Sequence, residues 1–286
     1  KVIAMYIEEI KEGQRFIEVA SKVNRKKPIV ILKAGNSEAG ARAISSHTGS
    51  LAGSKAAYQA AFAQTGVLIV DNVIELFNLA IAFSHQPAPA GNRIAVVTNA
   101  GGLAALASDS LSSNNLKLAD FSQETKDYLS KNLNQGAQVD NPIDLLGGGG
   151  PAEYEIALNR MIDDPGVDAI YALLVPHALI NPEEIAEVIG KVSKTSNKPI
   201  LSCIMGDRSL GNAIQILDNY QVPMFTFPEL GGKLFRMMSD YTEWKKAPPI
   251  EIKKIENIDK DKANLYLTEI KANNHLSEYH TRPILD

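Results

Sequence analysis

The sequence predicts an α/β protein of two units, each with helices that cover a mostly parallel sheet. Short runs rich in β-branched residues alternate with helical stretches from end to end, and this alternation requires crossover connections between parallel strands. A length of 286 residues with 45% hydrophobic residues suffices for two compact domains. The segment HQPAPAGN at 85–92 concentrates Pro, Ala and Gly without a periodic apolar face, which is typical of a linker.

The first part of the chain, before this segment, is predicted to alternate strands with helices. Its apolar, β-branched runs predict strands at 2–7, 28–32 and 67–70. Apolar residues at helical spacing predict helices at 13–23, 54–64 and 73–83. Parallel strands of this kind bring their carboxyl ends to one edge of the sheet.

The second part continues the alternation in a longer series. Its predicted strands are 94–98, 116–119, 169–175, 199–204 and 223–227. Its predicted helices are 103–111, 123–133, 152–162, 183–192, 210–219 and 230–244. This series fits a flavodoxin-like, doubly wound sheet, in which ligands gather at the carboxyl ends of the strands.

The composition argues against several classes of function. A formal net charge of −4 provides no basic excess for binding nucleic acid or an anionic membrane surface, so neither partner is expected. The single cysteine, Cys203, cannot form an internal disulfide, and no Cys/His spacing indicates a metal site. No apolar run in the sequence reaches the roughly 18 residues of a membrane-spanning helix. We therefore expect a cytoplasmic protein that has no metal site of its own.

The most unusual stretch is KAGNSEAGARAISSHTGSLAG at 33–53, in which one histidine, His47, stands among small residues. Small neighbours let a substrate or a second backbone come close. An imidazole can act as a nucleophile if one ring nitrogen is unprotonated while the other donates to a carboxylate that fixes the tautomer. His47 is therefore a candidate nucleophile that needs an acidic neighbour. By itself it is equally compatible with a packed or surface loop histidine.

Two carboxylates are candidates for that neighbour. Glu8 and Glu9 follow the first predicted strand, so they should lie at the sheet edge where the His47 segment also emerges. An equally good interpretation is that both residues stabilise the start of the next helix, because acidic side chains offset the helix dipole there.

The sequence TNAGG at 98–102 is a candidate anion site. It ends one predicted strand and directly precedes a helix, so its backbone N–H groups and the helix dipole can together hold a phosphate. Gly-Gly pairs at such turns also serve close helix packing, and that alternative remains open. The sequence contains neither a Walker A loop nor a complete GxGxxG after a strand, so no nucleotide site is predicted.

The remaining unusual residues are predicted to be structural. NPIDLLGGGG at 141–150 reads as a mobile surface loop, and Cys203 lies within a predicted buried strand. The other histidines have no clustered partners: His85, His177, His275 and His280.

These segments, in this order, resemble the ADP-forming acetyl-CoA synthetases, which are relatives of succinyl-CoA synthetase. The resemblance rests on KVIAMYIEEIKEGQRFIEVA, on KPIVILKAGNSEAGARAISSHTGSLAG, on TNAGGLAALASD and on NPIDLLGG, of which SHTGSLAG is the most specific. It implies succinyl-CoA synthetase-like units of the flavodoxin type. It divides the chain into a histidine-bearing ligase domain at 1–86, truncated at its start, and a second ligase domain at 93–244. The remainder, 245–286, would be a linker and the start of an ATP-grasp domain.

The resemblance also assigns roles to individual residues. It implies that His47 is phosphorylated and that Glu8, rather than Glu9, steadies it. It implies that the helix beginning at TNAGG presents its N-terminus to the phosphate. Asn99, Ala100, Gly101 and Gly102 would share this role. The implied reaction interconverts acyl-CoA, phosphate and ADP with a carboxylic acid, ATP and CoA.

The cofactors and partners follow from the same resemblance. CoA, ADP or ATP and magnesium would be bound mainly by domains that this sequence lacks, and phosphate would be bound here. The expected partners are ATP-grasp and CoA-binding domains of the same protein or complex, a small-molecule carboxylate, and further copies of the chain in a homo-oligomer. The fragment alone is expected to be inactive.

Two alternatives come from other functional classes. The chain could be a catalytically silent, ligase-like regulatory region of a protein acetyltransferase, although the retention of His47 with Glu8 argues against this. It could also be a plain flavodoxin-like interaction domain, in which case the match at His47 would be accidental.

Overall fold

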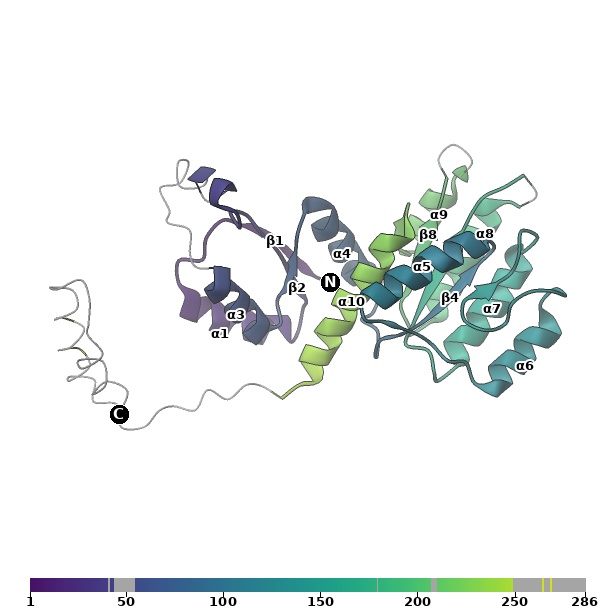
Figure 1. Ribbon diagram of the computed structural model, residues 1–286, viewed down its shortest axis with the longest axis horizontal. Helices are drawn as coiled ribbons and strands as arrows, with labels where there is room; N and C mark the ends of the chain where they lie inside the picture. The colour runs from purple at the N-terminus through teal and green to yellow at the C-terminus, as the bar shows by residue number, and fades with distance from the viewer. Residues whose placement is uncertain are drawn as a thin grey trace. The chain divides into compact units, whose positions relative to one another are not determined.

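The computed structural model describes residues 1–40, 42–43, 55–178, 180–206, 210–248, 264 and 268. Residues Lys1–Ala247 form one compact unit (Figure 1), and Pro248–Asp286 form a separate one. In the described part of the chain, no helix is long and apolar enough to cross a membrane.

The first sheet has three parallel strands in the order β1-β2-β3. They are β1 (Ile3–Ile7), β2 (Ile29–Lys33) and β3 (Leu68–Val70). Helices α1 (Gly13–Asn24) and α3 (Lys55–Thr65) pack on one face, where Ile29 and Ile31 point. Helix α4 (Val73–His85) packs on the opposite face, where Val30 and Leu32 point. Because residues of β2 point to both faces, all five of its residues are buried.

The second sheet is parallel, with the order β5-β4-β7-β8-β9 and with β6 also paired to β4. Its strands are β4 (Arg93–Thr98), β5 (Lys117–Leu118), β6 (Ile143–Asp144), β7 (Ala169–Leu174), β8 (Ile200–Ile204) and β9 (Met224–Phe225). Apart from β6, this order is the flavodoxin-like 2-1-3-4-5 order. The predicted α/β fold class with flavodoxin-like sheets is therefore confirmed.

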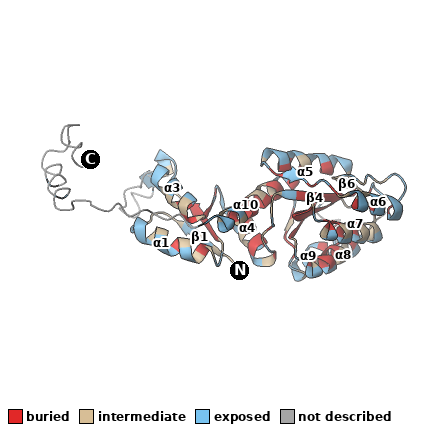
Figure 2. Cartoon of the chain, turned by 90° about the horizontal axis from the view of Figure 1, so that it is seen from below, coloured by how far each residue is buried: buried red, intermediate tan, exposed pale blue. Residues whose placement is uncertain are grey.

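Helices cover both faces of the second sheet. They are α5 (Gly101–Ser113), α6 (Gln123–Asn132), α7 (Pro151–Asp163), α8 (Pro182–Thr195), α9 (Ala213–Asn219) and α10 (Pro228–Lys246). Buried residues, red in Figure 2, line the strands and the inner sides of these helices. One core lies under α6 to α9, and the other lies under α5 and α10.

The core under α5 and α10 also extends to the first sheet. It includes Leu32 and Val70 from the first sheet and Leu79 from α4, together with Val96 from β4 and Leu234 from α10. The two sheets are separate, but they share this apolar cluster.

The segment at 85–92 between the sheets is tied down by hydrogen bonds. The Gln86 side chain donates to the Gln221 carbonyl at 2.7 Å and accepts from the Ile200 N–H at 3.0 Å. Ser239 of α10 donates to the Gly91 carbonyl at 3.0 Å. The segment has a linker's composition, but these bonds fix it against the second sheet and α10.

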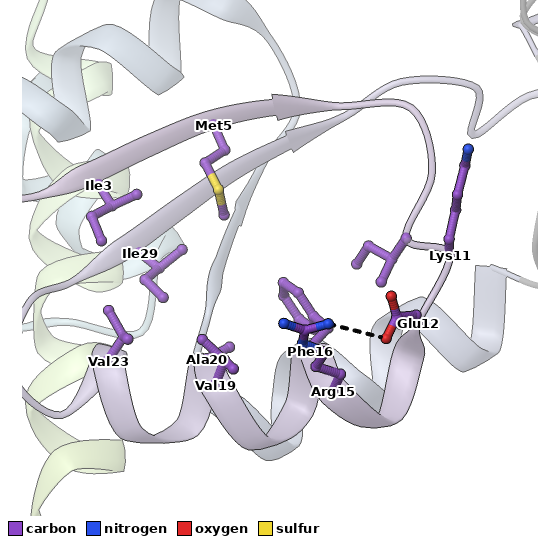
Figure 3. A pocket seen from close by; sticks show the side chains of 11 residues that line it. Ile3, Met5, Lys11, Glu12, Arg15, Phe16, Val19, Ala20, Val23 and Ile29 are labelled. Carbon is purple, nitrogen blue, oxygen red and sulfur yellow. Dashed lines mark ion pairs between the residues drawn. The ribbon is translucent and has the colours of Figure 1, made fainter.

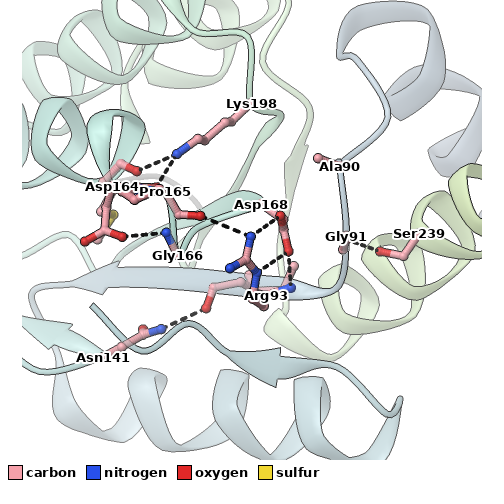
Figure 4. A network of polar contacts seen from close by, with 12 residues as sticks. Ala90, Gly91, Arg93, Asn141, Asp164, Pro165, Gly166, Asp168, Lys198 and Ser239 are labelled. Carbon is pink, nitrogen blue, oxygen red and sulfur yellow. Dashed lines mark hydrogen bonds and ion pairs between the residues drawn. The ribbon is translucent and has the colours of Figure 1, made fainter. Parts of the chain in front are cut away.

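Charged residues at the amino end of β4 are paired with one another (Figure 4). Asp168 accepts from the Arg93 Nε at 2.8 Å, from its Nη2 at 2.8 Å and from its backbone N–H at 3.0 Å. Lys198 Nζ donates to the carbonyl of Asp164 at 2.6 Å. A Cβ on Gly91 would lie 2.5 Å from Asp168 Oδ2, so glycine is needed where the chain enters β4.

One prediction about the second sheet was wrong. The stretch at 141–150 is not only a surface loop, because Ile143 and Asp144 form β6 beside Val97 and Thr98 of β4. The Asn141 side chain anchors it by accepting from the Val96 N–H at 2.9 Å and donating to the Ile94 carbonyl at 2.8 Å. These bonds hold the segment in the sheet although only two of its residues form ladder pairs.

Candidate functional site

The carboxyl ends of the strands hold the predicted site residues on two separate sheet edges. In doubly wound parallel sheets, ligands bind at such edges because the loops that follow the strands converge there. Glu8 and Glu9 follow β1 of the first sheet, and Asn99 to Gly102 follow β4 of the second.

At the first edge, two half-buried carboxylates lie near a buried ammonium. The Tyr6 hydroxyl donates to Glu8 Oε1 at 3.4 Å. Lys33 is the last residue of β2 and stands opposite Ile7 in the ladder, so it is placed next to the residues that follow β1. Burial lowers the pKa of Lys33, while the charges of Glu8 and Glu9 oppose this shift. The edge therefore combines two acidic groups with one basic group.

Lys33 has few polar contacts for a buried cation. The residue is only 6% exposed, and among the described residues its Nζ donates to the adjacent Ala34 carbonyl. Nζ also lies 4.8 Å from the centre of the Tyr58 ring, which is within cation–π range. The Tyr58 hydroxyl in turn accepts from the Ile10 N–H at 3.0 Å, which holds the ring in place.

His47 lies outside the described residues, as do most of its sequence neighbours between 41 and 54. The proposed pairing of Glu8 with His47 therefore remains a prediction. The structure places Glu8 and Glu9 at the carboxyl edge, as expected, and both are half-buried.

At the second edge, β4 passes directly into α5. Asn99 is buried, and its side chain donates to the Val175 carbonyl at 2.9 Å and accepts from the Val175 N–H at 2.9 Å. The Thr98 hydroxyl accepts from the Ala100 N–H at 3.1 Å. Both polar groups of the Asn99 side chain are therefore bonded to the Val175 backbone. Asn99 stabilises the turn by tying it to the segment that follows β7.

The first two residues of α5 are open to solvent. Gly101 and Gly102 are exposed, and no described side chain caps this helix. The N–H groups of a helix's first turn lack helical acceptors and carry partial positive charge, so an anion can bind there. A Cβ on Gly102 would meet no atom within 4 Å, whereas a Cβ on Gly101 would lie 3.1 Å from Asp144 Oδ2. Asp144 thus lies beside the turn, and its Oδ1 accepts from the Leu146 N–H at 2.9 Å.

The structure thus brings Asn99, Ala100, Gly101 and Gly102 together in one turn and places Glu8 on the other sheet. Sequence analysis missed two neighbours of these residues, Lys33 and Asp144. A lysine at the end of an otherwise apolar strand was a usable signal for Lys33. Asp144 could not be found without knowing that β6 pairs with β4.

Apart from these two edges, the described part of the chain offers an apolar groove on the first sheet and no metal site. Among the described residues, no group of three or more His, Cys, Asp or Glu side chains could hold a metal ion. A groove of about 480 Å³ lies along α1 and the strands β1 and β2 (Figure 3). It is lined mainly by apolar side chains such as Met5, Phe16 and Val23, and it contains none of the predicted site residues.

Two protein families match the chain. The family described as succinyl-CoA ligase like flavodoxin domain matches residues 1–83. The family described as ligase-CoA domain matches residues 94–246.

Curated relatives and solved structures agree with these matches. The alpha subunit of an ADP-forming acetate–CoA ligase II from Pyrococcus furiosus is 43% identical over 80% of this chain and 51% of its own length. An ADP-forming 4-hydroxybutyrate–CoA ligase from Nitrosopumilus maritimus is 34% identical over 95% of this chain and 39% of its own length. A dinucleotide-forming acetyl-coenzyme A synthetase 1 from Ca. Korarchaeum cryptofilum, solved with phosphate and ADP, superimposes with a TM-score of 0.79 at 32% identity. That match covers 85% of this chain and 53% of the synthetase chain.

The chain thus spans about half the length of these relatives or less. All of them are named as CoA ligases or synthetases, so the alternative of a silent region in a protein acetyltransferase finds no support.

Proposed function

Because this chain belongs to the family of ADP-forming acetyl-CoA synthetases and related acyl-CoA ligases, we propose that it performs the phosphoryl relay of such a ligase. The proposal rests mainly on the two sheet edges at the carboxyl ends of the strands. The edge after β1 holds Glu8 and Glu9, and the edge after β4 holds the open N-terminus of α5. The complete reaction interconverts acyl-CoA, phosphate and ADP with a carboxylic acid, ATP and CoA.

His47 receives the phosphoryl group from an acyl phosphate. The bond between phosphorus and the acyl oxygen breaks, a bond between phosphorus and an imidazole nitrogen forms, and the carboxylate leaves with the bonding electrons. The same group then passes from His47 to ADP. Such transfers depend mainly on positioning and on charge stabilisation. The protein therefore contributes chiefly by orienting the reacting groups and by stabilising the charge of the transition state.

Glu8 orients the imidazole. A carboxylate that accepts from one ring nitrogen fixes the tautomer and leaves the other nitrogen free to attack. Glu8 stands at the carboxyl edge, and the Tyr6 hydroxyl already donates to it, so its position is partly fixed. Its role as the partner of His47 follows from the family resemblance at the YIE segment.

The α5 turn holds phosphate. Its exposed glycines and the absence of a side-chain cap among the described residues leave backbone donors free to meet an anion. The related synthetase was solved with phosphate and ADP, which supports a phosphate site in this family. Asn99 keeps the turn in place through Val175.

The other cofactors belong to other parts of the ligase. Following the family resemblance, we assign magnesium, ADP or ATP and CoA mainly to ATP-grasp and CoA-binding domains in the same protein or complex. Magnesium would neutralise charge on the nucleotide phosphates there. We keep the domain division at 1–86, 93–244 and 245–286, and we expect the isolated chain to be inactive, because acyl transfer and nucleotide binding need those other domains.

The test is His47→Asn in the intact ligase. The variant should fold normally, because asparagine is a smaller polar residue that fits among the small sequence neighbours of His47, and it should lose all ligase turnover. CoA-dependent ATP formation at the wild-type rate would remove His47 from the mechanism.

A further inference from the structure

Lys33 is an unusual cation for its position. Among the described residues, it is the only lysine or arginine that is buried, and it ends a strand whose five residues are all buried. Nothing in packing demands an ammonium here, because an apolar side chain could fill the same space. A buried ionisable group at the edge where ligands gather is a candidate functional residue, because burial of a charge costs free energy.

Its electrostatic partners are near but not in contact. No carboxylate among the described residues lies within ion-pair distance of Lys33 Nζ, whose one hydrogen bond there is to the Ala34 carbonyl. Glu8 and Glu9 act on Lys33 through space and favour its charged form. An ammonium has three N–H donors, so Lys33 has more donor capacity than these residues use.

The charge balance at this edge shows what Lys33 can do. Glu8 and Glu9 together contribute two negative charges and Lys33 contributes one positive charge. A phosphoryl group on an imidazole would add nearly two more negative charges. Lys33 is the buried cation that stands beside these carboxylates, because it pairs with Ile7 in the ladder.

We propose that Lys33 is the counter-cation that allows the carboxylate edge of the first sheet to accept the phosphoryl group. This inference rests on the proposed function, in which His47 receives that group beside Glu8. Lys33 acts as a positioning residue, because its fixed charge lowers the electrostatic cost of the phosphorylated state. The Tyr58 ring and the Ala34 carbonyl keep the ammonium in place, so the charge need not be reorganised during transfer.

The experiment compares three variants of the intact ligase, each incubated with ³²P-labelled ATP. Lys33→Met removes the charge, Lys33→Arg keeps it, and Lys27→Met removes a charge from an exposed lysine near the amino end of the same strand. Phosphate on His47 and the thermal midpoint are measured for each. We expect Lys33→Met to carry about tenfold less phosphate or lower, because an opposite charge at close range changes such equilibria by that much or more. Lys33→Arg should keep most of the phosphate, and Lys27→Met should keep all of it.

The thermal midpoint separates this role from a structural one. Burial lowers the pKa of Lys33, so its protonated form costs stability in the folded protein at neutral pH. Lys33→Met should therefore keep or raise the thermal midpoint while it loses phosphate. If Lys33→Met does not fold, Lys33→Gln is measured in the same way.

Each outcome supports or overturns the role of Lys33. Equal phosphate in Lys33→Met and in wild type would overturn the role of Lys33 and leave the proposed function standing. An equal loss in Lys27→Met would also overturn it, because the effect would then be one of general charge. No phosphate on His47 in the wild type would overturn the proposed function, and the role of Lys33 with it.

Discussion

The two ends of strand β4 satisfy their polar groups in opposite ways. At the amino end, the exposed Arg93 side chain pairs with the buried Asp168, and Lys198 donates to a backbone carbonyl nearby. At the carboxyl end, the exposed turn at Gly101 and Gly102 starts a helix with no side-chain cap among the described residues. Paired groups stabilise the fold, whereas unpaired donors at a helix start remain available to a ligand.

The first sheet shows the same difference. At the amino end of β2, the buried Asn24 side chain accepts from the Ile29 N–H at 2.7 Å and donates to the Thr65 carbonyl at 3.0 Å. At the carboxyl edge, the charges of Glu8 and Glu9 act through space on the buried Lys33, which ends β2. Substitutions at carboxyl ends should therefore change activity, and those at amino ends should change stability.

Glu8→Gln should have the largest effect. The amide cannot accept from an imidazole as strongly as a carboxylate, so the tautomer and charge of His47 would no longer be fixed. We expect turnover of the intact ligase to fall by about 10²- to 10⁴-fold with an unchanged thermal midpoint. Glu9→Gln is the matched control and should cause a much smaller loss. Equal losses in the two variants would assign the role to the pair, and a larger loss in Glu9→Gln would assign it to Glu9.

Asp168→Asn should reduce stability and leave turnover nearly unchanged. The amide keeps the shape of Asp168 but loses the charge that meets Arg93, so we expect a loss of about 1–3 kcal/mol in the free energy of unfolding. Turnover below the unfolding temperature should stay near that of the wild type. Urea denaturation and ligase assays on the same preparation test this. A large loss of turnover without a loss of stability would show that the amino end also serves function.

Gly101→Val should reduce phosphate binding. A Cβ on Gly101 would already lie 3.1 Å from Asp144 Oδ2, and a branched side chain would cover the exposed N–H groups of the turn. We expect about tenfold weaker binding of inorganic phosphate, measured by calorimetry on the intact ligase, and a smaller effect on stability. Gly102→Ala is the control, because its Cβ would meet no atom within 4 Å. Unchanged phosphate binding and unchanged His47 phosphorylation in Gly101→Val would remove this turn from the mechanism.

Acid should weaken the amino-end network by a smaller amount. Burial alone would raise the pKa of Asp168, but the hydrogen bonds and charge of Arg93 lower it below its usual range. A carboxylate with a lowered pKa in the folded state stabilises the protein above its ordinary pKa, and this contribution is lost as the pH falls through the folded value. The free energy of unfolding should therefore drop by about 1 kcal/mol more between pH 5 and pH 3 in the wild type than in Asp168→Asn. Identical pH dependence in both proteins would show that the pair contributes nothing to acid stability.

The sequence predicted the fold well where its strands and helices are long and regular. The strand at Ala169–Leu174 and the helix at Pro182–Thr195, for example, lie within a residue or a few of their predicted bounds. Strand β6 was missed because its two residues follow a proline and precede a glycine run, which is the pattern of a loop. Its place depends on contacts between Asn141 and β4, which no local pattern reveals.

The candidate site was predictable only where its residues are consecutive. Asn99 to Gly102 form one turn, so the motif and the structure coincide. Lys33 was missed because it reaches the Glu8 edge through the pairing of β2 with β1, and the predicted strand ended one residue before it. Its cation–π contact is with Tyr58, which comes from a helix farther along the chain.

The most direct test of the account is the location of phosphate on the intact ligase. The wild-type protein is incubated with ³²P-labelled ATP, digested, and analysed for acid-labile, alkali-stable phosphate by mass spectrometry under alkaline conditions. We predict phosphate on the imidazole of His47, and none in His47→Asn. Phosphate on a different residue, or full turnover with no phosphorylated histidine at any time, would contradict the account.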